Sequence, residues 1–186
     1  MKMKKKGAME MSMGTIVTIV LLVSVLVMGI FFIQKISKTA TNVIDLTDEQ
    51  LRNEMNKLFS EDTSKKLVVY PATREVSIKK GESGGFGFSI RNTGNAEGSF
   101  SYTIDVMEIG QGCQLTQEEA ANLIILGKTG TGIQIPSGDV LENPIKIKFT
   151  IPDSTPLCNL GYGINVKKDG QTYLPTVSLY LEVKAK

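Results

Sequence analysis

The sequence contains no histidine and no tryptophan, and it has only two cysteines. The absence of histidine excludes Ser-His-Asp and Cys-His catalysis, histidine-ligated metals and imidazole pH switches. Two cysteines are too few for a zinc site made of four. The lack of tryptophan argues against an aromatic cage for carbohydrate or quaternary ammonium ligands. We therefore expect a non-enzymatic protein with no catalytic residues, metal ligands or cofactor.

Most of the chain also lacks an excess of charge of either sign. Of the 21 basic and 19 acidic residues, four lysines and one glutamate precede Lys35, which leaves 17 basic against 18 acidic residues. A balance this close to neutral offers little attraction to phosphates, so we expect no nucleic-acid partner. Several carboxylates occur near one another in sequence but match no calcium-loop pattern, and we expect them to be solvated surface groups: Glu118, Glu119, Asp139, Glu142 and Asp153.

One long segment lacks charge altogether, from Met11 to Gln34. Its core of twenty residues, Gly14–Ile33, would span about 30 Å as a helix, the thickness of a bilayer hydrocarbon core. A cleaved secretory signal usually has a shorter apolar region, of about 7–15 residues. The sequence therefore predicts a basic leader over residues 1–13 and a transmembrane helix over residues 14–34.

The lysines of the leader predict the orientation of this helix. Lys2, Lys4, Lys5 and Lys6 should stay in the cytoplasm by the positive-inside rule. Everything after Gln34 then lies outside the cell. We expect a single-pass protein of the cell membrane with a cytoplasmic N-terminus and an extracellular C-terminal domain.

Lys6, Gly7 and Ala8 stand directly before the apolar run. A short basic leader that ends in Lys-Gly resembles the class III signal peptide of archaeal type IV pilins and archaellum proteins. The resemblance covers roughly residues 1–35. It implies that a prepilin-type peptidase cuts between Gly7 and Ala8 and leaves the helix attached, ready to pack into a filament core. The alternative is a plain signal anchor that is never cleaved.

Two residues are candidates for a subunit or membrane interface under this resemblance, Glu10 and Gly29. Many pilins carry a glutamate at the fifth mature position, whereas Glu10 would be the third. Its carboxylate could neutralise the amino group of Ala8 on a neighbouring subunit or lie in the interface. Gly29 is a position where the helix could kink.

A linker over residues 35–66 carries its own helix signals. Thr47 and Gln50 match a capping box. The apolar residues that follow share one helix face, at Leu51, Met55, Leu58 and Phe59, and Ser60–Ser64 ends the helix. This amphipathic helix either packs on the exterior domain as a stalk or contacts a partner helix inside an assembly.

From residue 67 to 186 the pattern changes to alternating apolar residues separated by turns, which predicts an antiparallel all-β sandwich. Asp169-Gly170 is typical of a tight hairpin. The strands are expected at residues 67–70, 75–79, 86–90, 100–106, 140–151, 162–166 and 173–183.

Two stretches of this domain, residues 90–100 and 151–166, are similar to immunoglobulin-like domains of bacterial and archaeal surface proteins. In that comparison Tyr162 opens the sixth strand. The resemblance covers residues 67–186 and implies an immunoglobulin-like fold, which hosts many unrelated functions.

One segment departs from the strand pattern. Thr116 and Glu119 form a second capping box, which predicts a short helix that continues through Ala120–Ile124. The glycine-rich residues 126–132 then predict a loop between strands. They do not match a phosphate-binding loop, because Asn122 stands where the first glycine is needed.

Cys113 and Cys158 flank this segment. Outside the membrane, two lone cysteines in one domain most simply form a disulfide, and two free thiols are the alternative. The bridge would join the loop after the fourth strand to the loop before the sixth strand.

Two functions fit these features. The first is a type IV pilin-like or archaellum stator-like subunit that mediates assembly or envelope contact. Its partners would be the membrane, the prepilin-type peptidase, copies of the chain in an oligomer or filament, and a surface-layer protein. The second is an unprocessed, membrane-tethered immunoglobulin-like adhesin or scaffold that does not polymerise.

Overall fold

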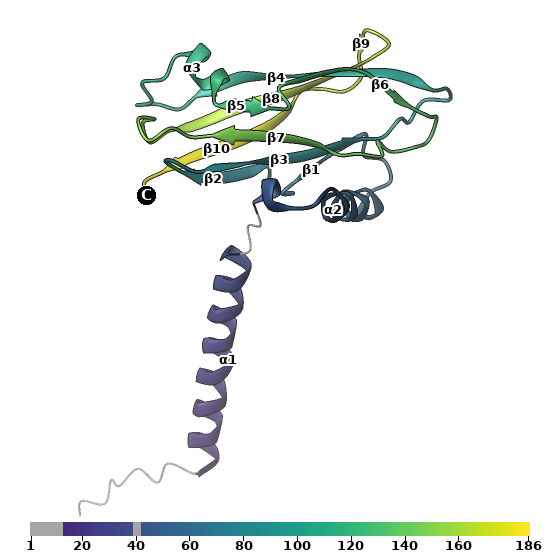
Figure 1. Cartoon of the computed structure of the whole chain (residues 1–186). Coiled ribbons are helices and arrows are strands. Elements are labelled where there is room, and N and C mark those ends of the chain that lie inside the picture. The colour runs from purple at the N-terminus through teal and green to yellow at the C-terminus, as the bar shows by residue number, and fades with distance from the viewer. Residues whose placement is uncertain (1–12, 39–41) are drawn as a thin grey trace, which may run out of the picture. The chain divides into compact units, whose positions relative to one another are not determined.

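The computed structural model of the chain describes residues 13–38 and 42–186 (Figure 1). By its internal contacts the chain divides after Ala40 into two units. The first contains helix α1 (Met13–Lys38), and the second contains the remaining helices and all the strands of the described residues. The two units are described separately below.

Helix α1 carries apolar side chains around its whole circumference. Twelve large apolar side chains between Ile16 and Ile30 are 43–67% exposed. The hydroxyls of Thr18 and Ser24 donate hydrogen bonds to the carbonyls of Gly14 and Val20 one turn earlier, at 2.8 and 2.7 Å. These two hydroxyls are therefore satisfied within the helix. Within the described residues, no helix was found that has the length and hydropathy needed to cross a membrane.

The second unit begins with two short helical elements, η1 (Val43–Asp45) and α2 (Asp48–Glu61). The predicted capping box is confirmed: the amide of Gln50 donates to Thr47 Oγ1 at 3.2 Å, and the amide of Thr47 donates to Gln50 Oε1 at 3.0 Å. Leu51, Met55 and Phe59 are at most 2% exposed, as expected for one apolar face.

The strands form two sheets, and the protein is mainly β, as predicted. The first sheet has four strands in the order β1-β3-β7-β5, and the second runs β2-β10-β8-β4-β6, with β9 paired to β8. All pairs are antiparallel except β2 with β10. The strands are β1 (Leu67–Tyr70), β2 (Glu75–Lys79), β3 (Ser83–Ile90), β4 (Gly98–Ile109), β5 (Ile124–Leu126), β6 (Thr129–Ile135), β7 (Ile145–Thr150), β8 (Asn159–Lys168), β9 (Gln171–Thr172) and β10 (Val177–Lys184).

The core lies between the two sheets and is rich in aromatic rings. Phe149 makes edge-to-face contacts with Phe86 in its own sheet, at 5.9 Å between ring centroids, and with Tyr162 in the other sheet, at 4.9 Å. Each such pair contributes about 0.5–1.5 kcal/mol beyond the area it buries. The hydroxyl of Tyr162 donates to the carbonyl of Ala120 at 2.9 Å, so the one polar atom of this ring is satisfied in the core.

Strand β3 is buried on both faces, which explains its unusual composition. Phe86, Phe88 and Ile90 point into the core, while Gly85 and Gly87 alternate with them on the opposite face. A Cβ atom on Gly87 would lie 2.7 Å from Leu51 Cδ1, because α2 rests on this strand. The glycines therefore make room for the linker.

The structure corrects the prediction for residues 120–132. Helix α3 (Gln117–Asn122) keeps its predicted capping box but ends before Ile124, which begins strand β5. Residues 129–132 of the glycine-rich segment belong to strand β6 rather than to a loop. Gly127, with φ of +76°, makes the turn between the two strands. Pairing with β4 overrides the low strand propensity of glycine here.

Two predicted strands are shorter than expected, and a proline accounts for each boundary. The strand predicted from Val140 begins at Ile145, directly after Pro144. The strand predicted from Tyr173 begins at Val177, two residues after Pro175. Proline cannot donate a backbone hydrogen bond to a sheet ladder.

Candidate functional site on the outer face of the second sheet

The linker covers the outer face of the four-stranded sheet. Lys146 on β7 forms an ion pair with Asp48 at 2.8 Å and donates to the carbonyl of Leu46 at 2.8 Å. At the other end of α2, Arg91 donates to the carbonyl of Thr63 at 2.7 Å and stacks over the ring of Phe59 at 4.5 Å. Of the two interpretations of this helix, packing on its own domain is confirmed.

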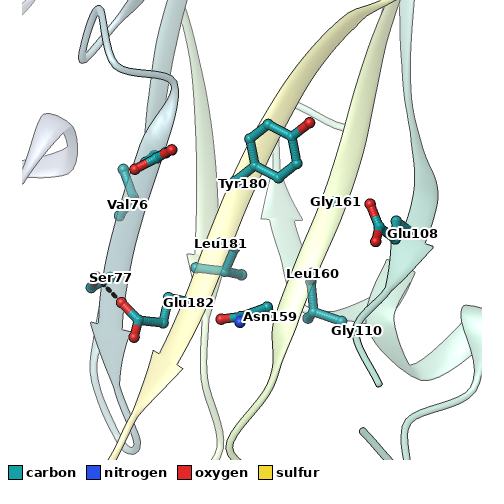
Figure 2. Close-up of a pocket in the computed structure, with 11 residues that line it drawn as sticks. Val76, Ser77, Glu108, Gly110, Asn159, Leu160, Gly161, Tyr180, Leu181 and Glu182 are labelled. Atoms are coloured by element: carbon teal, nitrogen blue, oxygen red, sulfur yellow. Dashed lines mark hydrogen bonds between the residues drawn. The ribbon is translucent and has the colours of Figure 1, made fainter. Parts of the chain in front are cut away.

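The outer face of the other sheet has no such cover among the described residues, and it contains a hollow of about 370 Å³ (Figure 2). The register places four residues in one row across four strands. Glu75 on β2 is paired with Tyr180 on β10, Tyr180 with Gly161 on β8, and Gly161 with Glu108 on β4. Figure 2 shows Tyr180 and Glu108 on opposite sides of Gly161.

Gly161 contributes no side chain to this row, and its backbone is buried. Neighbouring strands are about 4.8 Å apart, so the backbones of Tyr180 and Glu108 are separated by about 10 Å. A Cβ atom at Gly161 would lie 3.0 Å from Glu108 Cβ, so even alanine would be tight. A second hollow of about 310 Å³ shares Tyr180, Gly161 and Glu108 and continues toward Met107.

A β-bulge brings Glu108 to this face. Inward and outward residues alternate along β4 as far as Val106, where the register with β8 shifts before Glu108. The shift inserts Met107, so that Glu108 faces outward and Ile109 packs against the core. A bulge of this kind commonly redirects a side chain at a functional surface.

A second row closes one end of the hollow. Glu182 accepts a hydrogen bond from Ser77 Oγ at 2.6 Å and forms an ion pair with Lys184 at 3.1 Å. The hydrogen bond from Ser77, followed by the one from Lys184, holds the pKa of the Glu182 carboxyl below its ordinary value. Asn159 on β8 stands beside Glu182 in this row.

The disulfide between Cys113 and Cys158 is confirmed, with the two Cα atoms 5.2 Å apart. As predicted, it joins the loop after β4 to the loop before β8. It closes a loop of 45 residues and stabilises the fold by about 4 kcal/mol by the chain-entropy estimate. Close to this disulfide, the amide of Gly110 donates a hydrogen bond to the carbonyl of Asn159 at 2.8 Å. The disulfide and this hydrogen bond together fix the backbone at one end of the hollow.

The residues proposed from the sequence lie elsewhere. Lys6, Gly7, Ala8 and Glu10 fall outside the described residues. Gly29 lies in α1 with no atom within 4 Å of the position of an added Cβ, apart from the backbone of its own helix. In the described part of the chain, no group of three or more acidic residues or cysteines is arranged to hold a metal ion.

Sequence reasoning missed Glu75, Glu108, Gly161 and Tyr180. They come from four strands that are distant in sequence, so no local motif unites them. Simple alternation also places Glu108 on the wrong face, because the bulge is not visible in the pattern. An outward tyrosine between buried leucines, in Leu179-Tyr180-Leu181, is the one local signal.

Comparisons with known proteins do not assign a family. No family model matches the chain, and no curated protein matches it. Among solved structures, it is similar to a family 123 glycoside hydrolase from Clostridium perfringens, at 11% identity and a TM-score of 0.47 over 71% of this chain and 26% of that one. This chain therefore spans about a quarter of the length of that enzyme.

Two further solved structures are similar to parts of this chain. One is a PapD-like domain of human CEP192, at 10% identity and a TM-score of 0.37 over 65% of this chain and 85% of that one. The other is the alkylpurine DNA glycosylase AlkC of Pseudomonas fluorescens, at 14% identity and a TM-score of 0.37 over 73% of this chain and 37% of that one. Similarities this weak do not indicate a function.

Proposed function

We propose that the chain is a non-enzymatic, single-pass surface protein. In this proposal α1 anchors the chain in the cell membrane, and the β-sandwich outside the cell contacts another component of the envelope. The observation that carries the proposal is the exposure of twelve large apolar side chains around α1. Apolar surface this extensive is costly in water and needs a lipid or protein environment.

The sequence supports the anchor further. The side chains described in α1 run from Gly14 to Ile30, about 25 Å of helix. The uncharged run itself continues to Gln34, and its twenty-residue core would span about 30 Å. The lysines of the leader orient the anchor with its N-terminus in the cytoplasm.

We further propose that the sandwich is immunoglobulin-like. The order β1-β3-β7-β5 corresponds to strands A, B, E and D of that fold, and β10-β8-β4 corresponds to G, F and C. Strand β6 lies beside β4 where C′ lies beside C, although it follows β5 in the chain whereas C′ precedes D, and β2 is added beside G. The disulfide differs from that of antibody domains, because it joins two loops rather than strands B and F.

Within this class, we propose a type IV pilin-like or archaellum stator-like subunit whose leader is removed after Gly7. The packing of α2 on its own domain supports the stator-like form, because the apolar face of α2 is not left for a partner helix. The second candidate is a tethered module with an uncleaved leader. Its extracellular domain would be the same, so only the processing of the leader distinguishes the two candidates.

Membrane extraction tests the anchor. Wild-type protein should stay in the pellet after alkaline carbonate treatment of native membranes. A double variant with Leu22→Lys and Leu26→Lys should be released, because each charge at a membrane centre costs about 3 kcal/mol. Glu54→Lys on α2 is the control that changes the net charge by the same +2 outside the anchor, and it should stay in the pellet. Release of the wild type would contradict the anchor.

Intact mass tests the processing. Loss of Met1–Gly7 from protein purified from its native membrane would support the pilin-like class. A mass that retains these residues would contradict the proposed cleavage and would support the tethered module instead.

A further inference from the structure

We propose that the hollow lined by Tyr180 and Glu108 binds an arginine side chain of another protein. This inference does not depend on the membrane anchor, because the hollow lies entirely within the second unit.

Charge is the first reason. Glu75 and Glu108 stand at the two ends of the row, and neither carboxylate lies within ion-pair distance of a basic group in the described part of the chain. The residues that line the hollow include three carboxylates and no basic side chain, and Lys184 is paired with one of them, Glu182. The hollow therefore carries an excess of negative charge, and a cation is the ligand that complements it.

Shape is the second reason. The ring of Tyr180 and the carboxylate of Glu108 both line the hollow, on opposite sides of Gly161 (Figure 2). Tyr180 is 49% exposed, so part of its ring is open to a ligand. A planar guanidinium can stack on this ring while it donates hydrogen bonds to the carboxylate.

The hollow is also held in place before any ligand arrives. Its floor is a continuous sheet of four strands, and the hydrogen bond between Ser77 and Glu182 fixes one wall. The Cys113–Cys158 disulfide ties together the loops next to β4 and β8. A preformed site loses little conformational entropy on binding, which favours recognition of a single side chain.

A solution experiment on the full chain in detergent micelles tests this assignment. The probe is the blocked peptide Gly-Arg-Gly-Arg-Gly, titrated at low ionic strength and followed by the amide resonances of the sandwich. Gly161, Tyr180 and Glu108 should show saturable shifts. A peptide with citrulline in place of arginine, which has nearly the same shape but no charge, should produce none. Affinity should fall as salt is added, because the contact is ionic and partly exposed.

Three variants localise the binding. Glu108→Gln and Tyr180→Ala should each weaken the affinity about two- to fivefold, as expected for exposed ion pairs and cation–π contacts. Glu118→Gln on α3 removes one exposed carboxylate away from the hollow and should leave the affinity unchanged. Thermal melts of all the variants establish that they remain folded.

Three outcomes would overturn the assignment: equal binding of the citrulline peptide, an equal loss in Glu118→Gln, or an absence of shifts at Gly161. Neutral oligosaccharides are titrated in parallel. Saturable shifts at Tyr180 with an oligosaccharide and none with the arginine peptide would make the hollow a carbohydrate site instead.

Discussion

The docking of α2 on the four-stranded sheet makes a quantitative prediction for Leu51→Ala. Leu51 is fully buried, and its Cδ1 atom occupies the space that Gly87 leaves open. Truncation of a buried leucine to alanine usually costs 2–5 kcal/mol. Since this contact belongs to the smaller of the two apolar clusters, we expect a loss of about 3 kcal/mol in the free energy of unfolding. For a domain of this size, the loss lowers the melting temperature by roughly 10 °C.

The assay is thermal unfolding of the full chain in detergent micelles, followed by the circular dichroism of the strands. Asn56→Ala is the matched control, because Asn56 lies on the exposed face of the same helix. It should change the free energy of unfolding by less than about 0.5 kcal/mol.

A double-mutant cycle makes this test specific to the docked geometry. Gly87→Ala alone should destabilise the protein, because its Cβ atom would lie 2.7 Å from Leu51 Cδ1. In the Leu51→Ala background that space is vacated, so the same substitution should cost at least about 0.5 kcal/mol less. Strict additivity, or a Leu51→Ala variant as stable as Asn56→Ala, would refute the packing of α2 on β3.

Three further predictions concern the sandwich. Replacing Cys113 and Cys158 with serine should lower the free energy of unfolding by about 4 kcal/mol in a denaturant titration, and a loss below about 1 kcal/mol would contradict the closure of a 45-residue loop. Because the folded-state pKa of Glu182 is depressed, its stabilisation is complete above its ordinary pKa of about 4.5 and is lost as the pH falls through the folded value. Ser77→Ala should raise the pKa of Glu182 in a carbon-detected NMR titration, and an unchanged pKa would remove the role of that hydrogen bond. Asn92→Ala should cost about 3 kcal/mol in thermal melts, because this fully buried amide bonds the backbone of its own loop and the end of β6, and a cost near zero would show that water replaces it.

The sequence predicts the features of this fold that depend on local periodicity. Alternation identifies the strands that contain Phe86 and Ile104, because each has one face in the core. The capping boxes at Thr47 and Thr116 are also local, and both form as expected.

Features that depend on distant partners were not predictable in this way. Strand β6 forms because β4 supplies its hydrogen bonds, although its own glycines disfavour a strand. Likewise, Glu108 lines the hollow only because a β-bulge shifts the register of β4 against β8. The position of this bulge depends on the pairing of the two strands. The row from Glu75 to Glu108 exists only once four strands are in register.

Lysine labelling of intact cells tests the proposed surface location most directly. A membrane-impermeant amine reagent is applied before and after lysis, and the modified peptides are identified by mass spectrometry. Lys79 and Lys167, which are exposed on the second sheet, should be labelled in intact cells. Leader lysines that remain on the protein should be labelled only after lysis. Labelling of Lys79 and Lys167 only after lysis would contradict an extracellular sandwich and with it the proposed function.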